Sequence, residues 1–292
     1  MATVSAPRAT AARGALHSEP CRVCGRAADR VHQLTVLGRL PVGYYFCPHC
    51  GFMQTERPYW LEEAYSSAIA ASDTGLVMRN VALAARLAAV LHSTFGREAT
   101  FVDAGGGYGM LTRLMRDLGF DYYWDDPYCT NLFASGHEAG DRARFDAVTA
   151  FEVMEHVSDP LQFVRDTLAR FGARTFVFST QLFEGAPPAP GAWPYYSPET
   201  GQHVAFYQRR TLDHLAAALG MRAHSAGFFH VITDRDNLPA WKFRALAGRW
   251  SVALTPWIRR RRGGLTVRDR DRALARLRER PGHPDPSLGQ SR

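Results

Sequence analysis

The 292-residue sequence has no run of eighteen or more apolar residues, although a helix that crosses a bilayer needs about that many. It also lacks a charged and then apolar segment ahead of a small-residue cleavage site, which would mark a secretory signal. Neither a membrane span nor secretion is therefore expected, and the sequence predicts a cytoplasmic protein.

Acidic residues are missing from the first eighteen positions, which are rich in Ala, Ser, Thr and Arg. A transit peptide has such a composition, but we expect residues 1–18 to be a disordered leader instead. The apolar content of 46% over the whole chain is enough for one sizeable α/β domain with a small attachment.

The charge is unevenly distributed. The net charge of +7 comes mostly from the last fifty residues, which include Arg259 to Arg262 and the stretch "VRDRDRALARLRERPG". A solvated tail accounts for this pattern, and binding to phosphate or to anionic lipid is the alternative. We do not favour a nucleic-acid partner.

Cysteine is scarce, but four of the five cysteines form two C-x-x-C pairs. These are Cys21 and Cys24 in "CRVCG" and Cys47 and Cys50 in "CPHCG", and Cys129 stands apart. Two such pairs about twenty residues apart are typical of a tetrahedral zinc site, and four thiolates leave no open position for catalysis. We therefore predict a structural zinc ion, in preference to a disulfide framework or a redox pair.

The stretch "VHQLTVLGRLPVGYYF" between the two pairs alternates apolar and polar residues around a glycine-containing break, as a β-hairpin does. Residues 19–56 are thus expected to form a small zinc-ribbon-like domain. A helix capped by Asp73 or Thr74 should follow it. Its expected apolar face has three- and four-residue spacing and consists of Val77, Val81, Ala84, Ala88, Leu91 and Phe95.

The stretch "ATFVDAGGGYGMLTRLMRDLGF" predicts a short strand, a glycine loop and a helix. This order begins a doubly wound α/β fold, in which ligands bind beyond the carboxyl ends of the strands. A dinucleotide fingerprint would need a third glycine at the position of Met110. The spacing is instead D-x-G-x-G-x-G, with Asp103 before the three spaced glycines at positions 105, 107 and 109.

A carboxylate before this loop would repel a pyrophosphate but suits a cationic amino group. S-adenosylmethionine carries an amino group and a sulfonium and has no phosphate. The next strand, "FDYYWDD", ends in Asp125 and Asp126, and an acid at that point can accept hydrogen bonds from ribose hydroxyls. We prefer Asp126 as the ribose ligand.

A third strand, Phe145 to Phe151, is followed by Glu152, Glu155 and His156. A metal site of the H-x-x-E-H kind would need histidine where Glu152 stands, so we expect these side chains to line the cofactor and acceptor pocket. Asp159 and Pro160 predict the cap and first residue of the next helix.

With these motifs the chain resembles the class I S-adenosylmethionine-dependent methyltransferases over about residues 98–232. The segments "VDAGGGYG" and "FDAVTAFEVMEHVSDP" carry the resemblance. It implies a Rossmann-like doubly wound sheet, with Asp126 at the ribose and Glu152 near the sulfonium. The residues implied around the methionine part of the cofactor are Asp103, Gly105, Gly107 and Gly109. No third strand followed by an acid is evident, so the adenine contact is not assigned from the sequence; Asp141 is a candidate.

The segment "YYSPETGQHVAFYQRRTLDHL" is similar to one in sugar methyltransferases that also have an N-terminal domain with two cysteine pairs. That resemblance implies a sugar acceptor and makes His203 the candidate base, with His156 second. Gln202 and Thr200 differ from the residues usual in that group, which leaves methylation at carbon or at oxygen open. A nucleic-acid-directed methyltransferase or a zinc-ribbon nucleic-acid-binding protein is the alternative function.

The methyltransferase domain is expected over residues 57–234, a basic amphipathic helical extension over 235–262 and a mobile charged tail over 263–292. The extension is expected to dock on its own domain, with weak contact to a membrane surface as the alternative. Its expected apolar face consists of Phe243, Leu246, Ala247, Trp250, Leu254 and Trp257.

Overall fold

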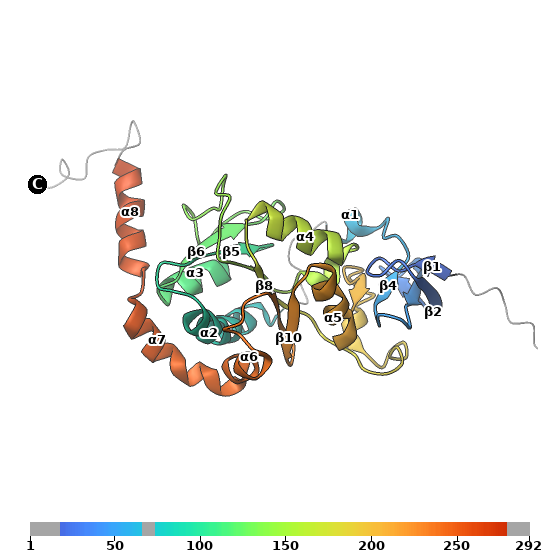
Figure 1. Ribbon diagram of the computed structural model, residues 1–292. Helices are drawn as coiled ribbons and strands as arrows, with labels where there is room; N and C mark the ends of the chain where they lie inside the picture. Colours follow the sequence, from blue (N-terminus) through green and yellow to red (C-terminus); the bar gives the residue numbers. More distant parts are fainter. Residues whose placement is uncertain (1–17, 66–73, 279–292) are drawn as a thin grey trace, which may run out of the picture.

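The computed structural model describes residues 18–65 and 74–278, which form two sheets flanked by helices (Figure 1). The larger sheet has six strands in the order β10-β11-β8-β7-β5-β6. The four strands from β6 to β8 are parallel, and β11 is antiparallel to both of its neighbours. The strands are β5 (Thr100–Ala104), β6 (Asp121–Asp125), β7 (Ala147–Ala150), β8 (Thr175–Ser179), β10 (Arg222–Ala226) and β11 (Phe229–Thr233). The predicted Rossmann-like α/β fold is confirmed.

Helices cover both faces of this sheet because alternate strand residues point to opposite sides. In β5, Phe101 faces the layer that contains α2 and α3, whereas Val102 faces the layer that contains α4 and α5. The first layer comprises α2 (Leu76–Thr94), α3 (Met110–Asp117), α6 (Ala240–Ala247) and α7 (Thr255–Arg262); the second comprises α4 (Pro160–Arg170) and α5 (Arg209–Ala218). The expected cap of α4 is present, since Asp159 Oδ1 accepts from the Gln162 amide at 3.1 Å.

Helix α2 differs from the expectation at its beginning. Gly75 stands at its N-cap in place of Thr74, and Asp73 lies outside the described residues. Val77 and Val81 are 55% and 48% exposed, because α2 becomes buried against the rest of the protein only from Leu83 onward.

Helix α2 is also the one helix among the described residues that is long and apolar enough to cross a membrane, with a mean hydropathy of 1.2. Of that apolar window, 44% is buried inside the protein. Core helices commonly have this composition, and the buried residues of α2 belong to the core beneath the larger sheet.

The smaller sheet is antiparallel and contains the predicted hairpin. Its turn places Leu37 and Gly38 at positive φ (53° and 69°). The strands are β1 (Ser18–Pro20), β2 (Ala27–Val36), β3 (Leu40–Phe46), β4 (Met53–Thr55) and β9 (Ala205–Phe206), and the short helix α1 (Leu61–Ala64) follows β4. Strand β9 comes from the segment assigned to the methyltransferase domain, so this sheet is not confined to residues 19–56.

The sequence predicted that the C-terminal extension is one helix with one apolar face, but the structure does not have this single helix. Extended backbone at Gly248 separates α6 from a 3-10 helix, η3 (Arg249–Leu254), which α7 follows. Phe243 and Ala247 are buried, but Trp250 and Trp257 are 78% and 49% exposed. The break at Gly248 changes the helical phase, so the later aromatic side chains do not continue the buried face.

The segment after residue 263 is also more ordered than expected, since helix α8 covers Thr266–Arg278. Its Asp269 is buried and accepts hydrogen bonds from Arg116 at 2.7 and 2.9 Å and from Arg113 at 3.0 Å. Arg116 is itself fully buried and also bonds to Asp121. A buried charge needs such partners, so this ion cluster attaches α8 to α3, at the opposite end of the molecule from β1 (Figure 1).

Candidate active site

The glycine loop connects β5 to α3 at the carboxyl end of the sheet. Gly105, Gly107 and Gly109 have φ values of 71°, 54° and 85°, which side chains rarely adopt. A Cβ on Gly105 would lie 2.8 Å from Val153 Cγ2. The glycine loop therefore packs directly against the loop that follows β7.

Asp103 lies at the end of β5 and is only 3% exposed. Its Oδ1 accepts a hydrogen bond from Thr149 Oγ1 at 2.7 Å, and the Tyr122 hydroxyl lies 2.6 Å from the same Thr149 oxygen. Burial raises the pKa of Asp103 to about 7, Asp126 adds to the rise, and the Thr149 hydrogen bond opposes it. No cationic side chain among the described residues pairs with Asp103, so a cationic ligand group would stabilise its ionised form.

Of the two acids after β6, Asp126 faces the glycine loop. Its Oδ2 accepts from the Gly107 amide at 2.8 Å, and its Oδ1 accepts from the amides of Tyr128 and Cys129. Asp125 instead forms a double hydrogen bond with Arg170. Asp126 therefore fixes the loop conformation, and its Oδ2, which accepts one hydrogen bond, keeps a second lone pair.

The strand that sequence reasoning did not find is a single parallel bridge, between Trp124 of β6 and Glu138. The Trp124 amide donates to the His137 carbonyl, and the Ala139 amide donates to the Trp124 carbonyl, both at 2.8 Å. Asp141 follows this bridge and is exposed.

Glu152 begins the loop after β7 with a φ of 56°, which is strained for a residue with a side chain. Two hydrogen bonds with Ser179 hold it. The Glu152 amide donates to Ser179 Oγ, and the Ser179 hydroxyl donates to Glu152 Oε1 at 2.6 Å. Its Oε2 lies 3.3 Å from Arg79 Nε of α2. The carboxylate is thereby fixed beside the glycine loop.

Glu155 and His156 lie on a short 3-10 helix, η1 (Met154–His156), and the structure brings His203 next to them. The two imidazole rings meet edge to face with centroids 4.9 Å apart. His156 Nδ1 donates to the Gln202 carbonyl at 3.0 Å, and His203 Nδ1 donates to the Tyr195 carbonyl at 2.6 Å. A carbonyl only accepts, so each ring has its proton on Nδ1 and a lone pair on Nε2.

Burial sets the ionisation of this cluster. It raises the pKa of Glu155 to about 7, with Glu152 adding to the rise, and it lowers the pKa of His203, with His156 adding to the fall. His203 is therefore neutral near pH 7 and can accept a proton. The sequence did not reveal this grouping, because His203 is 47 positions beyond His156 and no local pattern joins them.

The segment that carries His203 is hydrogen-bonded to the loop after β7 and to the cysteine cluster. The Val204 amide donates to the Glu155 carbonyl at 2.8 Å, and the Tyr207 hydroxyl donates to the Met154 carbonyl at 2.6 Å. Thr211 Oγ1 donates to the Cys50 carbonyl at 3.0 Å. One stretch of chain thus joins the histidine cluster to the cysteine cluster.

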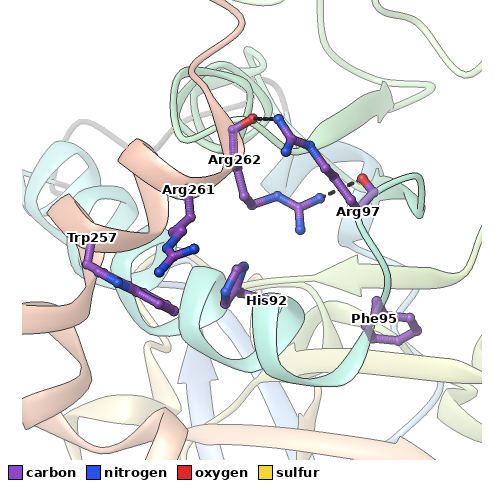
Figure 2. A pocket seen from close by; sticks show the side chains of 6 residues that line it. All are labelled: His92, Phe95, Arg97, Trp257, Arg261 and Arg262. Carbon is purple, nitrogen blue, oxygen red and sulfur yellow. Dashed lines mark hydrogen bonds between the residues drawn. The ribbon is translucent and has the colours of Figure 1, made fainter.

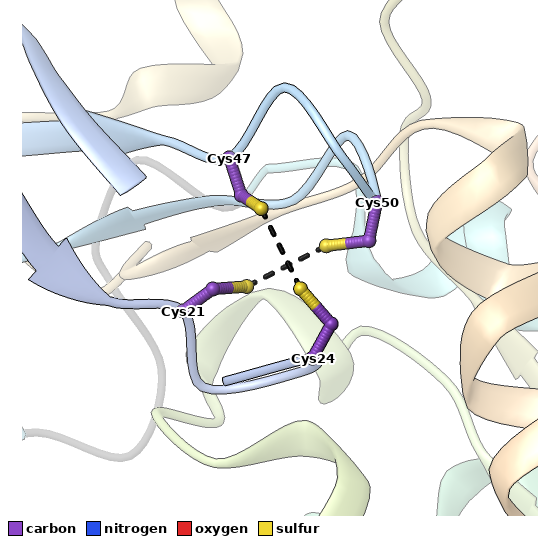
Figure 3. A group of neighbouring side chains, drawn as sticks. All are labelled: Cys21, Cys24, Cys47 and Cys50. Carbon is purple, nitrogen blue, oxygen red and sulfur yellow. Dashed lines mark hydrogen bonds between the residues drawn. The ribbon is translucent and has the colours of Figure 1, made fainter. Parts of the chain in front are cut away.

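The four paired cysteines converge, as Figure 3 shows. The Sγ atoms of Cys21 and Cys50, and those of Cys24 and Cys47, are 3.5 Å apart, and the four atoms all lie within 4.8 Å of one another. The four thiols are free, as is Cys129, so no disulfide forms. The neighbouring Cys50 thiol lowers the pKa of Cys21 to about 5. Four convergent sulfurs, one of them already acidic, fit a tetrahedral zinc ion.

With the fold and the site described, the comparison with known families is informative. A family model described as a methyltransferase domain matches residues 78–226, just over half of the chain. The chain belongs to this methyltransferase-domain family. The match covers the glycine loop, Asp126 and the histidine cluster and ends in β10.

Solved structures with a similar fold include TnmH, at 21% identity and a TM-score of 0.42, with 60% of each chain covered. The mitomycin 7-O-methyltransferase MmcR has 15% identity and a TM-score of 0.39, with 59% of each chain covered. The 1,6-didemethyltoxoflavin-N1-methyltransferase of Burkholderia thailandensis has 17% identity and a TM-score of 0.44, with 70% of this chain and 97% of that chain covered. This chain thus spans about 60% of TnmH and of MmcR. No curated protein sequence matches the chain.

The buried Asp103 carboxyl yields a prediction about stability. Its pKa is higher in the folded state than in the unfolded chain, so ionisation opposes folding. Relative to Asp103→Asn, the wild-type protein should lose stability as the pH rises from the unfolded value of 3.8 to about 7. The loss should be at most roughly 4 kcal/mol. Urea denaturation of both proteins across this range measures it, and a constant difference between them would contradict the assignment.

Proposed function

We propose that the protein transfers the methyl group of S-adenosylmethionine to a small acceptor, a sugar, at oxygen or at carbon. The observation that carries this proposal is the imidazole pair of His156 and His203 with free Nε2 atoms, in and beside the loop against which the glycine loop packs. A cofactor site and a proton acceptor are then neighbours, as methyl transfer to a hydroxyl requires.

Different residues of the chain would bind different parts of the cofactor. The Asp103 carboxylate pairs with the amino group of the methionine part, and the three positive-φ glycines let the backbone approach it. Asp126 would accept from a ribose hydroxyl with the remaining lone pair of its Oδ2. Glu152, held by Ser179 and Arg79, would be the acid near the sulfonium, where a negative charge would favour binding of the cation.

His203 is the proposed general base, with His156 second. For transfer to oxygen, Nε2 takes the proton of the acceptor hydroxyl as the new O–CH₃ bond forms and the S–CH₃ bond breaks. For transfer to carbon, Nε2 removes a proton alpha to a carbonyl before the C–CH₃ bond forms. Both routes use the same lone pair.

Aromatic side chains around His203 support a sugar acceptor. The Tyr195 ring lies 4.7 Å from that of His203, and the half-exposed Tyr65 ring lies 5.9 Å from that of His156. Trp193 packs against Tyr195 and donates its Nε1–H to Gln181. Such amphipathic rings suit the mixed polar and apolar faces of a sugar.

We also propose that Cys21, Cys24, Cys47 and Cys50 hold a structural zinc ion. The bound ion would hold the two C-x-x-C pairs together. It would thereby fix the position of Cys50, whose carbonyl accepts a hydrogen bond from Thr211. The convergent and mostly buried sulfurs support this role, and four sulfur ligands leave the ion closed to substrate.

The C-terminal extension carries a further proposal, weak contact with an anionic membrane surface. Residues 237–268 contain eight basic and no acidic residues, and Trp241, Trp250 and Trp257 are 71%, 78% and 49% exposed. Exposed tryptophan beside cationic side chains is typical of helices that lie in a lipid interface. The exposed rings favour a lipid surface over nucleic acid.

Figure 2 shows the hollow at which α7 meets α2 on this surface. It has a volume of about 490 Å³ and is lined by His92, Phe95, Arg97, Trp257, Arg261 and Arg262. Arg97 and Arg262 each donate to the other's carbonyl at 2.9 Å, and Arg261 lies over the Trp257 ring. A lipid phosphate would enter a hollow with this cationic lining.

The base assignment predicts the behaviour of His203→Gln. Its turnover with the true acceptor should fall by roughly 10² to 10⁴, because the proton acceptor is lost. Its affinity for S-adenosylhomocysteine should be unchanged, since His203 is not among the proposed cofactor ligands. Calorimetry and methyl-transfer assays measure both quantities, with His92→Gln as the control that retains activity. Full turnover in His203→Gln would show that another group is the base.

The zinc assignment predicts about one zinc ion per chain in the purified protein. Cys21→Ser should lose the metal and unfold at a markedly lower temperature, because binding a structural zinc ion contributes to folding. Elemental analysis and thermal denaturation report these changes, and Cys129→Ser is the matched control. A Cys21→Ser variant that kept wild-type stability would contradict a structural role.

The membrane contact predicts co-sedimentation with phosphatidylserine-containing vesicles and much less with phosphatidylcholine alone. The double variant Trp241→Ala and Trp250→Ala should lose this binding, whereas Tyr59→Ala, which removes an exposed ring from the other end of the chain, should keep it. Equal binding by the double variant would contradict the proposal. Tight, salt-sensitive binding to RNA or duplex DNA, without vesicle binding, would instead support a nucleic-acid partner.

A further inference from the structure

The side chains of Glu155, His156 and His203 have the composition of a metal site. One nitrogen or oxygen atom from each lies within 4.8 Å of the other two. Two imidazoles and one carboxylate are a ligand set suited to divalent transition-metal ions. We propose that this cluster binds such an ion, with Zn²⁺ and Co²⁺ as examples, and that the bound ion blocks His203 as a proton acceptor. The blocking role, but not the binding, rests on the proposed function.

The orientation of the two histidines supports metal binding. Each donates its Nδ1–H to a backbone carbonyl, His156 to that of Gln202 and His203 to that of Tyr195. Metal-binding histidines usually have their other nitrogen fixed by such a hydrogen bond, which sets the tautomer and aims the free lone pair. Both Nε2 lone pairs are thus available before any ion arrives.

Glu155 supplies an independent observation. Its side chain is 1% exposed, and its Oε2 has no hydrogen-bond partner among the described residues. No arginine or lysine in the described part of the chain forms an ion pair with it, whereas the nearby Glu152 is paired with Arg79. A buried polar atom without a partner is costly, and a divalent cation would satisfy it.

The required movement is small. Metal–nitrogen and metal–oxygen bonds of about 2.0 to 2.2 Å would bring the ligand atoms to roughly 3.3 Å from one another, compared with separations of at most 4.8 Å in the structure. Three protein ligands leave a coordination position for water or for an acceptor oxygen.

Binding and catalysis then compete. The Nε2 lone pair of His203 that would accept the acceptor's proton is the same lone pair that would bind the ion. An ion in the cluster would therefore lower turnover without affecting the cofactor residues beside the glycine loop. The nitrogen and oxygen ligands also distinguish this site from the sulfur ligands of the cysteine cluster.

Cobalt titration of the zinc-loaded protein tests the binding. We expect one Co²⁺ per chain beyond the zinc, measured by equilibrium dialysis with elemental analysis, and visible d–d absorption without the charge-transfer bands of thiolate ligands. Glu155→Gln and His203→Gln should each weaken cobalt binding at least tenfold, since each removes a ligand. His92→Gln, outside the cluster, should bind cobalt as the wild-type protein does.

Turnover in the same titration tests the blocking role. Using methyl-labelled S-adenosylmethionine and a pool of nucleotide sugars, we expect cobalt to inhibit the wild-type enzyme, with activity restored by brief chelation. Cobalt binding that persists in both ligand variants, or is absent from the wild-type protein, would overturn the metal site and leave the proposed function intact. Cobalt binding with unchanged or higher turnover would overturn the blocking role and His203 as the base.

Discussion

The arrangement of the site depends on one stretch of chain, residues 202–212, which joins three parts of the molecule. Strand β9 in this stretch pairs with β4 of the N-terminal sheet, and Thr211 reaches the Cys50 carbonyl. Val204 and Tyr207 bond to the loop after β7. Because of these contacts, a histidine that is remote in sequence reaches the carboxyl end of the larger sheet. The cysteine cluster is connected to the site through the Thr211 hydrogen bond to Cys50.

Two buried acids of the site, Asp103 and Glu155, have no cationic partner among the described residues, whereas Glu152 is paired with Arg79. Asp103 is buried with only a hydroxyl partner, Glu155 is buried with an unsatisfied oxygen, and Glu152 is paired at the mouth of the site. A sulfonium and an amino group would supply the positive charge that the glycine loop region lacks. The proposed divalent cation would likewise satisfy the unpaired Glu155 oxygen.

The local patterns predicted three neighbouring strands of the larger sheet, β5, β6 and β7, but not β8. Strand, glycine loop and helix follow from the spacing of Asp103 and its glycines, and Asp159 caps α4 as expected. The predictions were wrong where tertiary contacts decide the outcome. Gly248 interrupts the amphipathic pattern of the extension, and Asp269 draws α8 onto the buried Arg116. No sequence period reveals either effect.

The site residues, too, were predictable only where a local sequence pattern marks them. Asp126 was expected from its place after a strand, and the structure adds its bonds to the glycine loop. The approach of His203 to Glu155 and His156 was not predictable, because long-range pairing of β9 with β4 produces it. The cysteine pairs could be recognised from the sequence because their spacing is local.

The most direct test of the central claim is to incubate the protein with methyl-labelled S-adenosylmethionine and a pool of nucleotide sugars and oligosaccharides. Carbon-correlated NMR then shows which atom carries the label. We predict a new methyl group on a sugar, at carbon or at oxygen. The absence of transfer to any sugar, with S-adenosylhomocysteine still bound in a control titration, would contradict the proposed acceptor and leave only the cofactor site.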